Sequence, residues 1–386
     1  MKTTTRMLKI LLLVSAVFLT SNQMIAQTNT SPTQTVCVGS LAEPYLINPP
    51  TSGSTYQWTL TGGGAIVTGQ GTNAITIDWG MIPGGPHTLS VIETDANLCP
   101  GVPVIVDVML TLSAIADAGA DDNVCEGSTY TLGGTSASNN TGLSWTTSGT
   151  GSFNPTNTLT PIYTPSAADI AAGNVTLTLT ATGNSPCSDA ISSMVLTIIP
   201  AAIADAGADD NVCEGSTYTL GGTSASNNTG LSWTTSGTGS FNPTNTLTPI
   251  YTPSAADIAA GNVTLTLTAT GNSPCSDAIS SMVLTIIPAA IADAGADDNV
   301  CEGSTYTLGG TSASNNTGLS WTTSGTGALS GGNTLTPTYT PSAADIAAGS
   351  VTLTLTATGN TPCNDAISTM ILTINPSPIT GPINHW

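Results

Sequence analysis

The feature that most constrains the fold is an internal repeat. The string DAGADDNVCEG begins at Asp117, again at Asp205 and again at Asp293, so the copies are spaced at an interval of 88 residues. Around this string, Ala114–Pro200 and Ala202–Pro288 are identical, and a third copy replaces GSFNPTN with GALSGGN and makes a few further changes. A fixed interval of this size predicts a module that was duplicated in tandem.

A more distant module precedes these copies. It shares with them one pair of cysteines, Cys37 and Cys99, at the separation of 62 residues found in each repeat. The predicted boundaries are a first module at 27–112, repeats at 113–200, 201–288 and 289–376, and a segment at 377–386 that is either a tail or the start of a further module. Modules of roughly 88 residues have the size of a small domain that folds independently.

Residues 1–26 have the pattern of a secretory signal peptide. Lys2, Arg6 and Lys9 precede the apolar run ILLLVSAVFL, and a polar stretch follows that ends at Ala26. The apolar run is too short to span a bilayer as a stable helix, and no later stretch is long and apolar enough to be a membrane anchor. We therefore expect a secreted protein that does not insert into a membrane.

The charge of the chain excludes several classes of partner. It contains 3 Lys and Arg against 23 Asp and Glu, and all three basic residues lie in the signal peptide. Because the mature chain has nothing to neutralise phosphates, we expect it to bind neither nucleic acid nor an anionic membrane surface. Salt bridges cannot stabilise it, whereas regularly spaced cysteines behind a signal peptide predict disulfides.

Each module is expected to be an antiparallel β-sandwich. NVTLTLTATGN alternates apolar residues with threonine, which predicts a half-buried strand, and STYTLGG, LSWTT, TLTPIYTP and ISSMVLTI are further short strands between Gly, Asn, Ser and Pro turns. In SAADIAAG, Ser166 can cap about two helical turns that end at Gly173. Trp145, Trp233 and Trp321 lie within strands and are expected in the core. About seven short strands per module are typical of a sandwich, so the chain is predicted to be all-β.

Two stretches carry a resemblance to known families. STYQWTLTGGGAIVTGQGTNAITIDWG followed by HTLSVIETDANLC resembles the PKD-like modules of large surface proteins in Gram-negative Bacteroidota. ADAGADDNVCEG…TYTPSAADIAAGNVTLTLTATGN…C resembles their other Ig-like repeats. The resemblance implies tandem Ig-like/PKD-like sandwiches in an extended array, a secreted, adhesive or gliding-associated surface protein, and no catalytic residues. Such proteins usually end in a C-terminal sorting domain, and none is visible here.

The residues offer little material for catalysis. His87 and His385 lie far apart in the sequence and are expected to be solvated loop residues. Nucleophile elbows, HExxH and phosphate-binding loops are absent from the sequence, and the glycine-rich stretches at 62–64 and 148–151 are expected to be hairpin turns. A cysteine separation of 62 residues does not suit zinc, which needs close pairs. We predict that the protein is not an enzyme and needs no cofactor, apart from the ion considered next.

The repeated acidic stretch is the one candidate ion site. Its carboxylate and amide oxygens lie within ten residues of one another and are of the type that calcium prefers, at a junction between modules that an ion could stiffen. The spacing fits no EF-hand, and a solvated acidic linker is the plainer interpretation. The candidate residues are Asp117, Asp121, Asp122, Asn123 and Glu126, with their copies Asp205, Asp209, Asp210, Asn211, Glu214, Asp293, Asp297, Asp298, Asn299 and Glu302.

Two arguments about the disulfides disagree. Because each module contains two cysteines, pairing within modules leaves none unpaired. That scheme is Cys37–Cys99, Cys125–Cys187, Cys213–Cys275 and Cys301–Cys363. In the usual Ig-like topology, however, these partners lie at opposite poles, about 30 Å apart, and no disulfide spans more than about 7 Å between Cα atoms. End-to-end stacking would instead bring together Cys37 and Cys187, Cys125 and Cys275, and Cys213 and Cys363, which leaves Cys99 and Cys301 free. We predict the within-module scheme, which requires a short or displaced first strand.

Identical tandem copies favour a stalk or adhesin, because repetition adds length and avidity but nothing to an active site. Expected partners are extracellular surfaces or glycan ligands, or neighbouring surface proteins. The alternative is an array of specific ligand-binding modules for carbohydrate or, through the threonine rows of TLTLTAT, for ice. Threonine is also common on the wet face of any strand, and aromatic residues, which carbohydrate sites expose, are only 4% of the chain.

Overall fold

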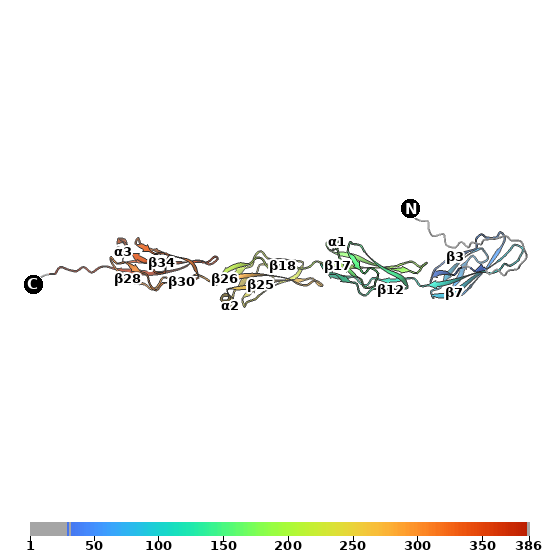
Figure 1. Cartoon of the computed structure of the whole chain (residues 1–386), viewed down its shortest axis with the longest axis horizontal. Coiled ribbons are helices and arrows are strands. Elements are labelled where there is room, and N and C mark those ends of the chain that lie inside the picture. Colours follow the sequence, from blue (N-terminus) through green and yellow to red (C-terminus); the bar gives the residue numbers. More distant parts are fainter. Residues whose placement is uncertain (1–28, 31, 384–386) are drawn as a thin grey trace. The chain divides into compact units, whose positions relative to one another are not determined.

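The computed structural model describes residues 29–30 and 32–383, so the signal peptide predicted at 1–26 and His385 lie outside the described residues. The chain divides into two compact units, Met1–Ile199 and Pro200–Trp386 (Figure 1). Four separate hydrophobic clusters of buried residues form the cores. Each cluster lies within the limits of one predicted module, two in each unit.

The first module consists of two sheets packed face to face. One has the order β1-β8-β7-β4 with β2 also paired to β8, and the other has the order β3-β6-β5. Trp58 and Leu89 from the first sheet meet Ile77 from the second in the core. The strands are β1 (Asn29–Thr30), β2 (Gln34–Cys37), β3 (Glu43–Leu46), β4 (Thr55–Thr61), β5 (Gly64–Thr68), β6 (Ala74–Trp79), β7 (Gly84–Thr94) and β8 (Val104–Thr111).

The second module has the same plan with more strands. Its larger sheet has the order β10-β17-β16-β13, and the facing layer is formed by β11-β15-β14 and β12-β9. The elements are β9 (Ile115–Asp117), β10 (Asp122–Cys125), β11 (Tyr130–Thr131), β12 (Ser136–Ser138), β13 (Asn140–Thr147), β14 (Ser152–Asn154), β15 (Ile162–Thr164), α1 (Ala167–Ala172), β16 (Asn174–Gly183) and β17 (Ala190–Ile199).

The second unit repeats this module twice. The third module contains β18 (Ile203–Asp205), β19 (Asp210–Cys213), β20 (Tyr218–Thr219), β21 (Ser224–Ser226), β22 (Asn228–Thr235), β23 (Ser240–Asn242), β24 (Ile250–Thr252), α2 (Ala255–Ala260), β25 (Asn262–Gly271) and β26 (Ala278–Ile287). The fourth contains β27 (Ile291–Asp293), β28 (Asp298–Cys301), β29 (Tyr306–Thr307), β30 (Ser312–Ser314), β31 (Asn316–Thr323), β32 (Ala328–Ser330), β33 (Thr338–Thr340), α3 (Ala343–Ala348), β34 (Ser350–Gly359) and β35 (Ala366–Asn375).

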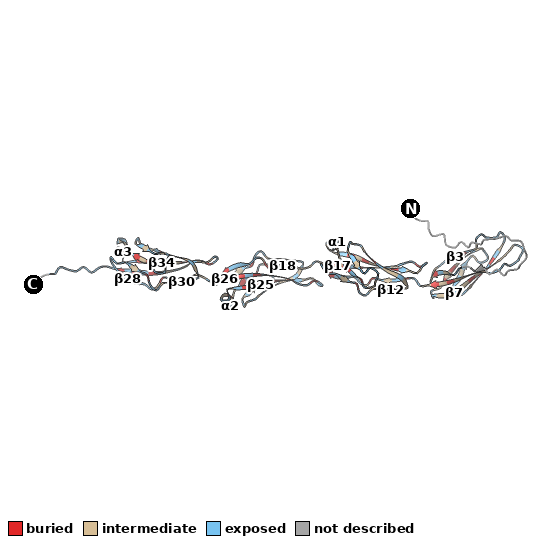
Figure 2. Ribbon diagram, viewed as in Figure 1, coloured by how far each residue is buried: buried red, intermediate tan, exposed pale blue. Residues whose placement is uncertain are grey.

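The alternating pattern of NVTLTLTATGN is confirmed as strand β16. Its Leu177 and Leu179 are fully buried, whereas the intervening threonines are half-buried on the outer face. Figure 2 shows buried segments on the strands of the sandwiches. Trp145, Trp233 and Trp321 are all core residues with at most 6% exposure. The indole nitrogen of Trp145 donates to the carbonyl of Thr158 at 3.0 Å, which satisfies its polar atom inside the sandwich.

The short helix is confirmed with the predicted ends. Ser166 forms a capping box with Asp169, and Gly173 ends α1 with φ of 77°, a left-handed conformation that favours glycine. The sequence analysis did not predict that Asp169 would be buried. Only 2% of its surface is exposed, and its carboxylate accepts from Tyr163 Oη at 2.8 Å, from Ser166 N at 2.9 Å and from Thr150 N at 3.0 Å.

The two glycine-rich turns do not close hairpins as predicted. The turn at 62–64 joins β4 to β5, and the turn at 148–151 joins β13 to β14, and in both cases the two strands belong to different sheets. At the second turn, glycine is required by the buried carboxylate. A Cβ at Gly149 would overlap Asp169 Oδ1, and a Cβ at Gly151 would meet Tyr163 Oη and Asp169 Oδ2.

Candidate functional site at the module junctions

In each sandwich, a short strand that pairs in parallel with the last strand carries a cysteine to the end where the chain leaves the module. In the first module, β2 pairs in parallel with the last strand β8, and Cys37 lies beside Thr111. The next module presents Cys187 in the turn between its last two strands, β16 and β17. Cys37 and Cys187 form a disulfide with Cα atoms 5.5 Å apart. This bond crosses the junction between two modules.

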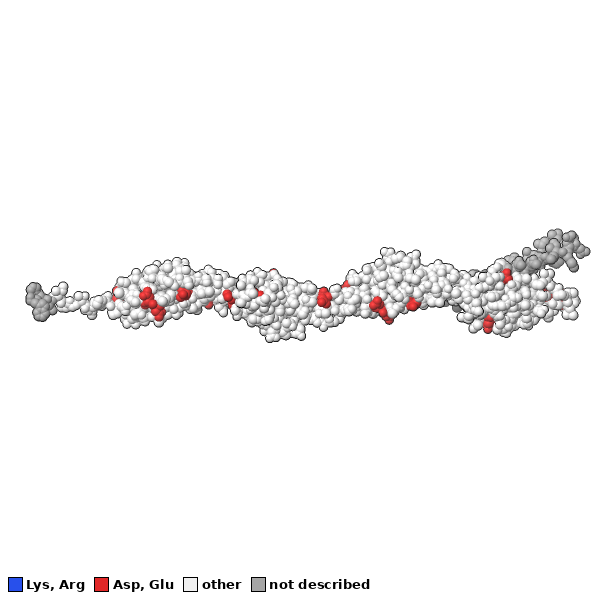
Figure 3. Space-filling model, turned by 90° about the horizontal axis from the view of Figure 1, so that it is seen from below, with Lys and Arg blue, Asp and Glu red and all other residues white. Residues whose placement is uncertain are grey.

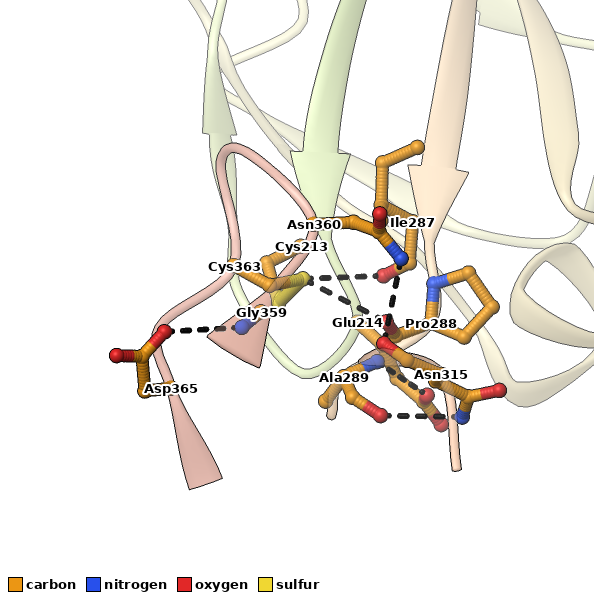
Figure 4. Close-up of a disulfide and its surroundings, with 10 residues drawn as sticks. All are labelled: Cys213, Glu214, Ile287, Pro288, Ala289, Asn315, Gly359, Asn360, Cys363 and Asp365. Atoms are coloured by element: carbon orange, nitrogen blue, oxygen red, sulfur yellow. Dashed lines mark hydrogen bonds between the residues drawn. A yellow bond between two sulfur atoms is a disulfide. The ribbon is translucent and has the colours of Figure 1, made fainter. Parts of the chain in front are cut away.

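The second unit repeats this arrangement between its two modules (Figure 4). Cys213, at the end of β19, forms a disulfide with Cys363 from the turn between β34 and β35, and their Cα atoms are 4.9 Å apart. Cys363 Sγ lies 3.4 Å from the carbonyl oxygen of Ile287 and 3.8 Å from that of Pro288. The sulfur therefore lies against the last residues of the preceding module.

Polar side chains hold the linker beside this disulfide (Figure 4). The carboxylate of Glu214 accepts from Ala289 N at 3.2 Å, and Asn315 Nδ2 donates to the carbonyl of Ala289 at 3.0 Å. Asn360, from the turn that carries Cys363, donates to the carbonyl of Asn315 at 3.2 Å. The linker is thus bound by one residue of the module before it and one residue of the module after it.

The within-module disulfide scheme is wrong. Cys37 and Cys187 bond to each other, as do Cys213 and Cys363; Cys125 and Cys275 also belong to disulfides, and Cys99 and Cys301 are free and exposed. The pairs Cys37–Cys99, Cys125–Cys187, Cys213–Cys275 and Cys301–Cys363 are therefore all excluded.

The physical reason is strand length. Cys37 lies beside the last residue of β8, whereas Cys99 precedes the first, and a strand of 8 residues separates its two ends by about 25 Å. Strand β2, which carries Cys37, is not displaced enough to bring these two cysteines together, because its parallel pairing with β8 fixes where it ends.

The acidic stretch is spread over the surface of its module. Asp117 Oδ1 accepts from Gly119 N, Asp121 Oδ1 accepts from Val195 N, and Asp122 accepts from Tyr130 Oη. Tyr130 is half-buried, and this burial together with the nearby carboxylate raises its pKa to about 12. Among the described residues, no three His, Cys, Asp or Glu side chains gather closely enough to hold a metal ion. Calcium binding by these residues stays a prediction.

The copies of these residues have the same local roles. Asp209 and Asp297 accept from the backbone of the last strand in their modules, Asp210 and Asp298 accept from tyrosines, and Asp205 and Asp293 accept from the next glycine. Their oxygens are therefore directed at several different partners of the fold. Glu214 and Glu302 contact the segment that follows their module, with Glu214 accepting from Ala289 N at 3.2 Å and Glu302 accepting from Ser377 N at 3.1 Å.

His87 is not the solvated loop residue that was predicted. It lies in strand β7, half-buried, with its ring 6.3 Å from that of Trp79. A Cβ at Gly63 would overlap the imidazole, so the histidine packs against the glycine-rich turn. Its role is packing within the first module.

The face of the molecule drawn in Figure 3 is acidic without a concentrated patch. Figure 3 shows Asp and Glu in small, separated groups on one face, with no Lys or Arg among the described residues in view. The described part of the chain also contains no helix long and apolar enough to cross a membrane.

Comparison with known proteins agrees with the fold. The family model of a PKD-like domain matches residues 23–101, most of the first module. The modules are PKD-like and Ig-like sandwiches. No curated protein sequence matches the chain.

Solved structures of tandem cadherin and titin domains are similar in fold at low identity. Protocadherin gamma B7 extracellular cadherin domains 1–4 share 12% identity over 89% of this chain and 99% of theirs, with a TM-score of 0.33. Drosophila N-cadherin domains EC1–4 share 12% over 90% and 100%, with a TM-score of 0.31. Titin domains I67–I69 share 14% over 69% and 99%, with a TM-score of 0.40. At these values the likeness carries no argument about function.

Proposed function

We propose that the chain is a secreted, non-catalytic stalk or adhesin on the outer surface of a Gram-negative bacterium. Its modules act as spacers and make weak, multivalent contacts with extracellular surfaces, glycans or neighbouring surface proteins. Multivalent display suits identical copies, because linked weak contacts raise the overall avidity without any strong single site.

One observation carries this proposal: the disulfides Cys37–Cys187 and Cys213–Cys363 join successive modules. A crosslink inside a module would stabilise that module but leave the next one free to swing on its linker. A crosslink across the junction holds two modules together at a second point besides the linker, so it limits bending and carries tension covalently. Those are the properties that a stalk needs.

The ligand-binding alternatives lack an observation of this kind. On the outer face of the larger sheet, the threonines of β16 do not lie in a flat threonine field. Thr178 lies beside Ser193 and bonds to it at 2.9 Å, Thr180 lies beside Ile191, and Thr176 lies beside Val195. Ice recognition needs several coplanar threonine rows, and here the neighbouring row is mixed.

Small-angle scattering of the mature chain tests the proposal. Strand rise gives roughly 40 Å per module with its linker, so four modules placed end to end should have a maximum dimension of about 150 Å. Adding a reductant should broaden the distribution of distances, because opening the junction disulfides lets the modules bend. A compact, near-spherical envelope under oxidising conditions would contradict the stalk.

A further inference from the structure

The two free cysteines, Cys99 and Cys301, occupy different positions in their modules. One has the position of the strand-end cysteine of a junction and the other has the position of the turn cysteine. Cys301 ends β28 in the fourth module, the position that Cys213 holds in the third. Cys99 lies between β7 and β8, the last two strands of the first module, as Cys363 lies between β34 and β35. One copy of the chain thus carries an unused strand-end cysteine and an unused turn cysteine.

The environment of Cys301 already has the form of an occupied junction. Cys301 lies beside Asn375 in the parallel register that places Cys213 beside Ile287. Glu302 N donates to the carbonyl of Asn375 at 2.8 Å, as Glu214 N does to that of Ile287 at 2.8 Å.

The segment that follows the fourth module is held as a linker is. Ser377 N donates to the carboxylate of Glu302 at 3.1 Å, and the corresponding bond from Ala289 N to Glu214 measures 3.2 Å. In the third module this arrangement receives Cys363. The same arrangement at the end of the fourth module therefore offers Cys301 in a conformation ready to accept a turn cysteine.

Cys99 is presented as a turn cysteine should be. The Asp95 carboxylate accepts from Asn97 N at 2.9 Å and from Cys99 N at 2.8 Å, and Asp95 N donates to the carbonyl of Cys99. These bonds fix the turn and leave the thiol exposed. In the bonded turns, Cys187 and Cys363 are no more than 9% exposed, because the preceding module covers them.

We propose that Cys301 of one copy forms a disulfide with Cys99 of a second copy, so that chains join head to tail into covalent multimers. Cys301 then has a turn cysteine as its partner, as Cys37 has Cys187 and Cys213 has Cys363. Such a contact is heterologous, so it propagates to a third and a fourth copy. This proposal goes beyond the stalk function, since a monomeric stalk needs no such bond.

The chemistry is a two-step exchange with a disulfide donor, for which oxidised glutathione serves in the test. The Cys301 thiolate attacks the donor, forms a mixed disulfide and releases one glutathione thiol. The Cys99 thiolate of the second copy then attacks the Cys301 sulfur and releases the second glutathione thiol. Two protein thiols are oxidised to one disulfide, the donor is reduced to two glutathione thiols, and the two protons of the protein thiols end on the released glutathione thiolates.

The test uses the mature full chain and two serine variants, Cys99→Ser and Cys301→Ser. In an oxidised glutathione buffer, the native chain should give a ladder of dimers, trimers and larger species on a non-reducing gel. A mixture of the two variants should stop at a dimer, because each variant retains one half of the junction. The double variant is the matched control and should stay monomeric.

Mass spectrometry of the dimer should identify a peptide pair that contains Cys99 and Cys301. A native chain that stays monomeric in this buffer would overturn the proposal, and so would symmetrical Cys99–Cys99 or Cys301–Cys301 dimers, or a Cys99–Cys301 bond within one chain. None of these outcomes affects the scattering test of the stalk, because the maximum dimension can be measured on the double variant, which is monomeric.

Discussion

Cys37 is bonded to Cys187, 150 residues further along the chain, although Cys99 belongs to its own module. The parallel pairing of β2 with β8 explains this choice, because it places Cys37 at the exit of the module beside Thr111. Cys213 likewise bonds to a cysteine of the next module, Cys363, which is also 150 residues further along the chain. Both of these disulfides therefore lie at junctions between modules.

Disulfide mapping tests this rule on the two bonds Cys37–Cys187 and Cys213–Cys363.

Cleavage after glutamate distinguishes this scheme from the within-module one. The mature chain contains five Glu, and Glu43 is protected by Pro44, so the cysteine-bearing fragments are 27–93, 94–126, 127–214, 215–302 and 303–386. In the monomer without reductant, the bonds Cys37–Cys187 and Cys213–Cys363 predict one linked species with 27–93, 127–214 and 303–386, from which 94–126 is absent. Within-module pairing would instead link all five fragments into one species.

Removal of one junction disulfide should lower stability, whereas removal of a free thiol should not. While the third module is folded, Cys213 is held beside Ile287, so its bond to Cys363 closes a loop of roughly 75 residues in the unfolded fourth module. A Cys213→Ser/Cys363→Ser variant loses this closed loop, which is worth up to about 4 kcal/mol on the chain-entropy model. Urea unfolding followed by tryptophan fluorescence measures the change. Cys99→Ser is the control, since its thiol is free, and its unfolding midpoint should match that of the parent. An unchanged midpoint in the double variant would show that the crosslink does not stabilise the folded modules.

Trypsin should leave the mature protein uncut, even after reduction and unfolding. All Lys and Arg residues lie within positions 1–26, so signal removal takes away each cleavage site. Incubation with trypsin in urea, followed by mass measurement, checks this. Cleavage by a glutamate-specific protease under the same conditions shows that the chain is accessible. Any tryptic fragment would mean that the signal peptide is retained.

Gly149 of the 148–151 turn is expected to be required for stability. Its copy in the fourth module is Gly325, where the requirement can be tested. A Cβ at Gly325 would overlap Asp345 Oδ1 and lie 2.8 Å from Val351 Cγ1, whereas a Cβ at Gly309 would have no neighbour within 4 Å. We expect Gly325→Ala to destabilise the fourth module by roughly 1–3 kcal/mol, as overpacking does, and Gly309→Ala to be nearly neutral. Calorimetry of the full chain can compare the two variants. Equal effects would mean that the turn relaxes around the added methyl group.

The sequence predicted those parts of the structure that depend on local pattern. The alternation of apolar residues and threonine predicted β16, the capping residues predicted α1, and the position of Trp145 within a strand predicted its burial. The sequence-based prediction failed where the outcome depends on which residues of neighbouring modules meet in space. The partner of Cys37 is decided by the parallel register of β2 and by the approach of a neighbouring module. Neither is visible in residue spacing.

The buried aspartates were missed for a related reason. SAADIAAG predicts a capped helix, in which Asp169 is a capping-box residue that could equally face solvent. Its burial depends on Gly149 and Tyr163, which come from other parts of the module. The tyrosine and the two glycines of SGTG are the signal that could have been used, since they leave room for a carboxylate beside a hydroxyl donor.

The last prediction concerns the pH dependence that these aspartates cause. Burial alone would raise the pKa of Asp345, but hydrogen bonds from Ser342 N, Tyr339 Oη and Thr326 N outweigh it and hold the pKa well below its usual value. A carboxyl with a lowered pKa in the folded state stabilises the fold above its unfolded pKa, about 4, and this contribution is lost as the pH falls towards the folded value.

Asp345→Asn should therefore destabilise the fourth module by about 2–3 kcal/mol at pH 7, since hydrogen bonds to a charged acceptor are lost. The difference from the parent chain should shrink as the pH falls below about 4, because the parent then begins to lose the same contribution. Calorimetry at pH 7, 5, 4 and 3 measures it, with the second and third modules as internal references of unchanged sequence. Asp365→Asn is the matched control, because that exposed carboxylate accepts one bond, from Gly359 N at 2.9 Å, and its replacement should change little. A difference between Asp345→Asn and the parent that stays constant from pH 7 to pH 3 would show that the buried carboxyl contributes through packing alone and not through its charge.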